Sequence, residues 1–98
     1  MKHDILRSIK DIGLCLKTLI KARFNKNTKV IYTSSGRYKS LYISFYKNHI
    51  WQFYIEDKVS YYMIYLLKDN KVAKKDVLKK GETIDRFYTR ILHFINLI

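Results

Sequence analysis

Residues 37–47 read RYKSLYISFYK, and their side chains alternate with a period of two. Leu41, Ile43 and Phe45 are apolar, whereas the even positions between and beside them are serine or tyrosine. Alternation of this kind predicts a strand with one buried face and one face open to solvent. The stretch therefore predicts an antiparallel sheet that is covered on one side and rich in tyrosine on the other.

Turn residues on both sides of this stretch predict a meander. Ser35 and Gly36 predict a tight turn after a strand at 28–34, because glycine readily adopts a positive φ. Residues 47–49 predict a short turn before a strand at 50–55, and residues 56–58 predict a loop before a strand at 59–67. These segments predict four strands in antiparallel order.

The length of the turn at 47–49 decides which side chains share a face. With three residues in the turn, Trp51, Phe53 and Ile55 join the apolar face, and Tyr54 and Glu56 join the tyrosine face. A two-residue turn would exchange the two sets. We favour three residues, because the buried face is then uniformly apolar.

Both ends of the chain have helical periodicity. Apolar residues recur at steps of three and four between residues 4 and 24, with Asp4 near the start and Asn25 at the end. Gly13 lies on the apolar side and predicts a close approach to the sheet. A last helix follows residues 81–83, with Thr83 as its N-cap. The lysine-rich segment 72–80 fits either an edge strand or a helix.

These elements predict an α+β fold. We expect a two-layer sandwich in which the N- and C-terminal helices lie on one face of a four-stranded antiparallel meander, in the order α-β-β-β-β-α. The 98 residues predict a single domain, 1–98. The hydrophobic share of 48% and aromatic share of 15% argue against intrinsic disorder. No uncharged run approaches the roughly 18–20 residues that would span a membrane.

Charge is the strongest hint of a partner. The formal net charge is +12, and residues 25–47 contain five basic residues and no acid. Part of the lysine excess reflects composition, because residues with A/T-rich codons (Lys, Ile, Tyr, Phe and Asn) fill 47 of 98 positions. The shortage of acids has no such explanation, and it favours a polyanionic partner. Cys15 has no partner cysteine, which favours a reducing, cytoplasmic location, or the host cytoplasm for a phage-encoded protein.

Two sets of residues are candidates for that interaction. Aromatic rings beside cations are what single-stranded nucleic acid binds, because bases stack on rings and phosphates need positive charge. The same tyrosines suit a protein interface or plain cross-strand packing, and the same lysines suit a solvated surface. The stacking or contact candidates are Tyr38, Tyr42, Tyr46 and Tyr54, with Tyr62 on the same face. The nucleic-acid-binding candidates are Arg7, Lys10, Lys17, Lys21, Arg37, Lys39, Lys74, Lys75, Lys79 and Lys80.

No sequence motif predicts catalysis. His3, His49 and His93 lie on separate elements without metal-ligand spacing, so neither a metal site nor a cofactor is expected. We therefore expect a non-enzymatic binding protein that docks nucleic acid or a nucleoprotein. The alternative is a protein-binding inhibitor or accessory factor of phage or mobile-element type, including a homodimer through the tyrosine face. A third alternative is an RNA-cleaving toxin that uses His49, Arg37 and Glu56.

Overall fold

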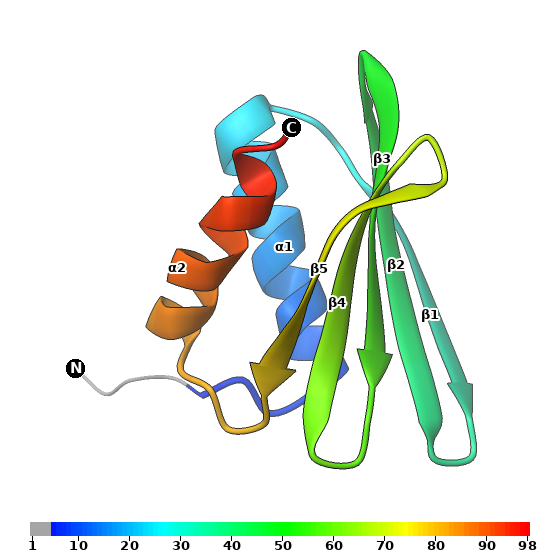
Figure 1. The fold of residues 1–98 in the computed structure, drawn as a ribbon, viewed down its shortest axis with the longest axis vertical. Coiled ribbons are helices and arrows are strands. Elements are labelled where there is room, and N and C mark those ends of the chain that lie inside the picture. The colour runs from blue at the N-terminus through cyan, green and yellow to red at the C-terminus, as the bar shows by residue number, and fades with distance from the viewer. Residues whose placement is uncertain (1–4) are drawn as a thin grey trace.

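Figure 1 shows a helix, a five-stranded sheet and a second helix in that order along the chain. The computed structural model describes residues 5–98. Adjacent strands are antiparallel and follow sequence order across the sheet. The elements are α1 (Ile9–Phe24), β1 (Lys29–Ser35), β2 (Tyr38–Lys47), β3 (His49–Asp57), β4 (Tyr61–Lys68), β5 (Lys71–Lys79) and α2 (Ile84–Ile95). The predicted α+β class is confirmed, but the sheet has five strands and not four.

The fifth strand is the lysine-rich segment for which the sequence left two alternatives. Leu78 points into the core opposite Tyr62, while Lys75 lies on the other face opposite Tyr65. The period of two was hard to read in the sequence because lysine occupies both faces of this strand. Lysine on an outermost strand also discourages pairing with other chains.

The alternation in β2 continues into β3 as predicted. Lys47 pairs with His49 around Asn48, whose φ is 63°, so the parity of a three-residue turn is kept. Phe45 consequently lies opposite Trp51, and the following odd-numbered pairs also face the core. The tight turn supplied by Asn48 therefore fixes which face of the sheet is buried.

The placement of Tyr62 on the tyrosine face is wrong. Its side chain is only 2% exposed, and it lies opposite Asp57 and Leu78. The loop before β4 sets this register, because Lys58 N donates a hydrogen bond of 2.9 Å to Tyr61 O. Even-numbered residues of β4 then enter the core, and Tyr65 takes a position on the open face.

The first helix is shorter than predicted. It begins at Ile9, because the Ser8 hydroxyl accepts a 3.4 Å hydrogen bond from Asp11 N and caps the helix. Asp4 lies outside the described residues. Asn25 ends the helix as predicted, with a φ of 55°. Gly13 does approach the sheet closely: a Cβ atom there would lie 2.8 Å from Leu41 Cδ2.

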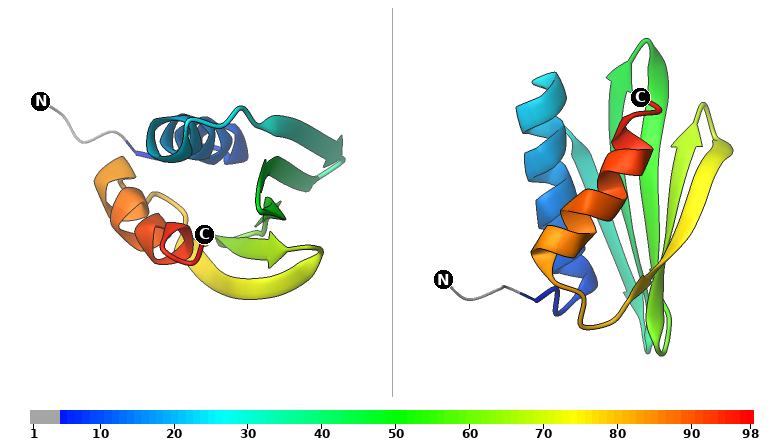
Figure 2. Two further views of the ribbon diagram at one scale, coloured as in Figure 1. Left: turned by 90° about the horizontal axis from the view of Figure 1, so that it is seen from above. Right: turned by 60° about the vertical axis from the view of Figure 1, so that its left-hand side comes forward.

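The second helix closes the core. Thr83 caps it as predicted, since its hydroxyl accepts a 3.3 Å hydrogen bond from Arg86 N. Phe87, Ile91 and Phe94 are buried against the sheet and α1. Figure 2 shows that both helices lie on the same side of a curved sheet, which leaves its other side open. No helix among residues 5–98 has the length and apolar character needed to cross a membrane.

Candidate nucleic-acid interface

Three tyrosines form a row across the open face of the sheet. Tyr42, Tyr54 and Tyr65 lie opposite one another on β2, β3 and β4. Their rings are stacked, with centroids 4.5 Å apart for Tyr42 and Tyr54 and 5.5 Å apart for Tyr54 and Tyr65. We call these residues the tyrosine ladder. The register of the antiparallel strands brings the three rings together, because side chains directly opposite each other on one face of a sheet are close neighbours.

Glu56 fixes two rings of the ladder. Its carboxylate accepts hydrogen bonds from the Tyr54 hydroxyl at 3.0 Å and the Tyr65 hydroxyl at 3.2 Å. Burial, assisted by the negative charge of Glu56, raises the pKa of both phenols above the usual value. Both hydroxyls therefore remain donors at neutral pH, and each can keep its hydrogen bond to Glu56.

The stacking inside the ladder limits which rings are free to bind a base. Tyr54 has a tyrosine ring against each face, so neither face can accept another ring. Tyr38 and Tyr46, at the two ends of β2, are 76% and 64% exposed and have no ring neighbour in the described structure. They lie about 27 Å apart along the strand, at about 3.4 Å per residue. Tyr38 and Tyr46 are thus the most exposed of the predicted tyrosines.

Cations surround this face. Lys29 on β1 and Lys75 and Lys79 on β5 are exposed, and by register they point to the same side as the ladder. Glu56 is the one acid that the described strands place on this side, and it is occupied by the two tyrosine hydroxyls. The open face is therefore an aromatic strip with lysines along β5 and one lysine, Lys29, at the start of β1.

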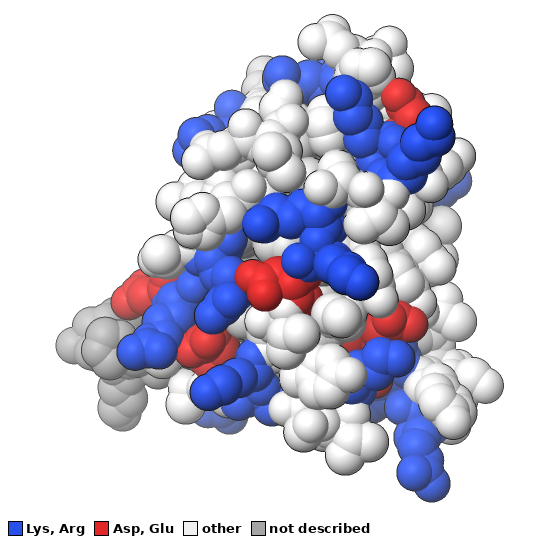
Figure 3. Space-filling model, viewed as in Figure 1, with Lys and Arg blue, Asp and Glu red and all other residues white. Residues whose placement is uncertain are grey.

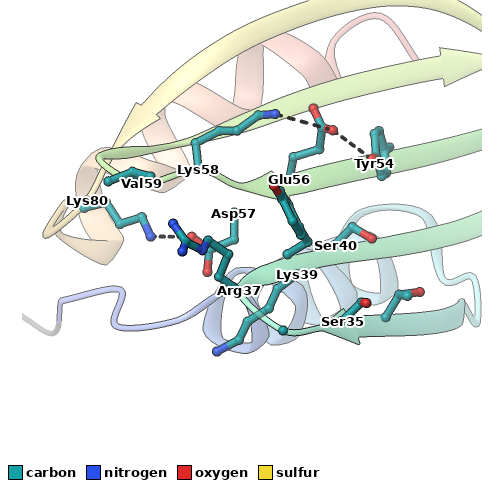
Figure 4. A pocket seen from close by; sticks show the side chains of 13 residues that line it. Ser35, Arg37, Lys39, Ser40, Tyr54, Glu56, Asp57, Lys58, Val59 and Lys80 are labelled. Carbon is teal, nitrogen blue, oxygen red and sulfur yellow. Dashed lines mark hydrogen bonds and ion pairs between the residues drawn. The ribbon is translucent and has the colours of Figure 1, made fainter.

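A hollow of about 530 Å³ lies at one end of this strip, between the β1–β2 turn and the β3–β4 loop. Tyr38, Arg37 and Lys58 line it. Figure 4 shows Lys58 directed to Glu56 and Lys80 directed to Asp57, and the Lys58–Glu56 ion pair spans 3.7 Å. Arg37 points toward the Lys80–Asp57 pair but makes no ion pair with an acid of residues 5–98. An exposed ring and an unpaired guanidinium therefore share one hollow.

The predicted basic residues of the N-terminal region lie elsewhere. Lys10, Lys17 and Lys21 lie on α1, on the opposite side of the sheet from the tyrosine ladder, and Arg7 precedes the helix. Lys10 Nζ lies 4.7 Å from the centre of the Tyr32 ring, on the helix side of β1. A ligand that binds one face of the sheet therefore cannot contact both these basic residues and the tyrosine ladder.

The remaining predicted cations are divided between the two faces. Lys39 lines the hollow, although Figure 4 shows its side chain directed away from it. Lys74 lies on the helix side, with Nζ 5.5 Å from the centre of the Phe94 ring. Lys80 forms an ion pair with Asp57 and covers the Tyr62 ring. In Figure 3, basic side chains spread over this side of the molecule, with acidic side chains interspersed among them.

The three residues considered for RNA cleavage are not brought together. Arg37 and Glu56 line the hollow, whereas His49 lies at the other end of β3, about 24 Å from Glu56 at 3.4 Å per residue. His49 Nδ1 instead lies 2.7 Å from Asp69 Oδ2. Within residues 5–98, no cluster of three His, Cys, Asp or Glu side chains could hold a metal ion.

The sequence did not identify Tyr65, Lys29 and Lys58 as members of this surface. In β4 both sets of alternate residues are apolar or aromatic, so the sequence could not tell which set faces the core. The tight turn at Gly36 did contain a signal for Lys29, because it fixes the β1–β2 register.

No known family, curated protein or solved structure matches this chain.

Proposed function

We propose that this protein is a non-enzymatic nucleic-acid-binding protein that docks single-stranded RNA or DNA on the open face of its sheet. The observation that carries the proposal is the hollow, which is lined by the exposed Tyr38, by Lys58 and by Arg37, whose guanidinium has no ion pair with an acid of residues 5–98. An unpaired base stacks on such a ring while a phosphate binds the neighbouring cations. Duplex DNA is a poorer ligand, because its bases are already stacked on each other.

The rest of the open face can hold a single nucleic-acid strand that extends away from the hollow. Tyr46 offers a second exposed ring at the far end of β2, and the tyrosine ladder separates the two. Lys75 and Lys79 line one edge of this path and Lys29 lines the other. The bound strand would therefore stack at both ends and place its phosphates along the edges.

Fluorescence anisotropy tests the proposal with labelled single-stranded RNA, single-stranded DNA and duplex DNA at ~50 and ~200 mM salt. Tyr38→Ala should weaken single-strand binding roughly 5- to 150-fold, as expected when one base can no longer stack. The triple variant R37Q/K75Q/K79Q should weaken binding and reduce the salt slope by about 0.7 for each phosphate that is no longer neutralised.

A matched control removes the same charge from the other side of the sheet. The triple variant K10Q/K17Q/K21Q changes the net charge equally but leaves the open face intact. It should retain most of the affinity. Equal reductions of affinity in both triple variants would mean that binding follows net charge alone, and the proposed interface would then be wrong.

Exposed apolar residues favour a second candidate function, a protein-binding inhibitor or accessory factor. Ile31 and Ile50 on the open face are 46% and 54% exposed, close to the tyrosines. Aromatic and aliphatic anchors of this kind are common in protein interfaces. Analytical ultracentrifugation tests the homodimeric form: a dimer that persists at ~500 mM salt and is absent in Tyr46→Ala would support it over nucleic-acid binding.

A further inference from the structure

The outer edge of β1 is unprotected. β1 is the first strand of the sheet and pairs with β2 alone, and all seven of its residues are exposed. Val30, Ile31 and Tyr32 are 42%, 46% and 37% exposed, and no charged residue separates Lys29 from Arg37. The other outermost strand, β5, carries several lysines. An uncharged, exposed edge is a template for adding another strand.

The hydrogen bonds of the sheet identify the free backbone groups of this edge. Asp69 N donates to Ile50 O at 2.8 Å and Lys58 N to Tyr61 O at 2.9 Å, so even-numbered residues of β3 bond toward β4. The registers then direct odd-numbered residues of β1 toward β2. Val30, Tyr32 and Ser34 therefore point their backbone N–H and C=O groups outward.

A row of lysines on α1 runs beside this edge. Lys10 covers the Tyr32 ring, and Lys21 Nζ donates a 3.3 Å hydrogen bond to Asn27 Oδ1 in the connection to β1. Lys17 lies seven residues from Lys10 and hence on the same side of the helix. We call these three residues the α1 lysine stripe. None of them forms an ion pair with an acid of the described chain.

The stripe and the edge have similar lengths. Lys10 and Lys21 are separated by about 16 Å along the helix axis, at 1.5 Å per residue. β1 extends about 20 Å at 3.4 Å per residue. A strand added beside β1 would therefore lie within reach of the lysine side chains over most of its length.

We propose that β1 accepts an extended segment of a partner protein in which Glu or Asp alternates with apolar residues. The outward groups of Val30, Tyr32 and Ser34 bond to the main chain of the segment. Its acidic side chains point to the helix side and meet the α1 lysine stripe. Its apolar side chains point to the open side and pack beside Ile31. This edge adjoins the hollow, since Thr33 and Ser35 of β1 line it, but the inference does not depend on nucleic-acid binding.

Charge argues against a second copy of this chain as the added strand. Antiparallel pairing of two β1 strands about a two-fold axis would place both α1 helices on one side and bring the two lysine stripes together. Each copy also carries a net charge of +12. Like charges at such a contact disfavour the pair, whereas an acidic segment neutralises the stripe.

A labelled nine-residue peptide with alternating glutamate and valine tests the inference. We expect it to bind more tightly than a scrambled peptide of the same composition, and to slow amide exchange at Val30, Tyr32 and Ser34. The amides of Ile31 and Thr33 already point to β2 and should change little. Alternate residues of the bound peptide direct their backbone N–H groups to β1. N-methylation of these residues should abolish binding, whereas N-methylation of the other alternate set should leave binding unchanged.

Reciprocal variants separate this site from the open face. K10Q/K17Q/K21Q should weaken peptide binding about tenfold, while R37Q/K75Q/K79Q should leave it nearly unchanged. Three outcomes would each overturn the proposal. They are no peptide binding at ~1 mM, equal binding of the scrambled peptide, and unchanged exchange at the three outward amides. Protection of these amides that rises with protein concentration alone would also overturn it, because it would identify a second copy.

Discussion

Glu56 is the residue on which the open face depends most. It accepts hydrogen bonds from Tyr54 and Tyr65 and lies 3.7 Å from Lys58, so one carboxylate joins the tyrosine ladder to the hollow. Hydrogen bonds to a charged acceptor are stronger than those between neutral groups. A change at Glu56 should therefore alter both stability and the order of the rings.

Glu56→Gln should make the protein less stable by about 1 kcal/mol near neutral pH, because two charge-assisted hydrogen bonds are weakened. The pKa of Tyr54 and of Tyr65 is raised in the folded protein, so their contribution is present below pH ~10 and is lost as pH rises further. The stability difference between wild type and variant should narrow at pH ~11. Urea denaturation followed by the fluorescence of Trp51 measures it. A difference that widens with alkaline pH would contradict this account.

Gly13 is a second residue with a definite steric role. Alanine favours helix by about 1 kcal/mol over glycine, but the added Cβ would lie 2.8 Å from Leu41 Cδ2 in a buried contact. Overpacking of this kind costs about 1–3 kcal/mol. Gly13→Ala should therefore be neutral to destabilising in the wild type.

The same substitution should become favourable when Leu41 is also shortened to alanine, because the space for the Cβ is then available. Denaturant unfolding of the two single variants and the double variant gives the coupling free energy between positions 13 and 41. We expect it to exceed about 1 kcal/mol. Additive effects would show that Leu41 does not restrict residue 13.

At the scale of elements, the N-terminal end of α2 is the point where two distant parts of the chain meet. Thr83 both caps α2 and pairs with Ile5 in an isolated bridge, so it connects the N-terminal segment to the second helix. Leu6 N strengthens this connection by donating a 2.9 Å hydrogen bond to Glu82 O. The cap is therefore expected to affect both ends of the chain.

Thr83→Ala should reduce the free energy of unfolding by about 1 kcal/mol through loss of the N-cap hydrogen bond. Thr89→Ala in the same helix is the matched control, since Thr89 is exposed and its hydroxyl donates a hydrogen bond to Asp85 O within the helix. Alanine is the better helix former there, so this variant should be neutral or slightly more stable. Equal destabilisation by both substitutions, in thermal unfolding, would argue against a capping role.

At the scale of the whole molecule, the distribution of charge is the dominant feature. The net charge of +12 is spread over both faces of an 11.9 kDa chain, and the described ion pairs involve only a few of the cations. Repulsion among unpaired cations destabilises the compact state. Polyanions that bind either face would relieve it.

Salt should therefore stabilise the free protein. Raising ionic strength from ~50 to ~500 mM shortens the screening length to a few ångströms, so the melting temperature should rise by several degrees. Circular dichroism at two salt concentrations measures the shift. Sucrose at matched osmolality provides a control without screening. A melting temperature that falls with salt would show that attractive pairs outweigh repulsion.

The local sequence predicted much of the fold. Alternation at 37–47, the parity of the next strand and the Thr83 cap depend on neighbours in the chain, and all are confirmed, as is the close approach of Gly13 to the sheet. The local sequence does not distinguish a strand from a helix at 72–80, and it predicts the wrong face for Tyr62, because both segments have side chains that suit either side of a sheet.

What the sequence determined by itself is the class of fold and the tyrosine-rich face of β2 and β3, since periodicity and turn residues act over a few positions. Only the tertiary structure decided which tyrosines stack on each other, and it alone placed the α1 lysines on the opposite side from the ladder. These features depend on register across three strands and on the side that the helices cover. The physical reason is that such contacts join residues distant in the chain, whose relative position no local pattern encodes.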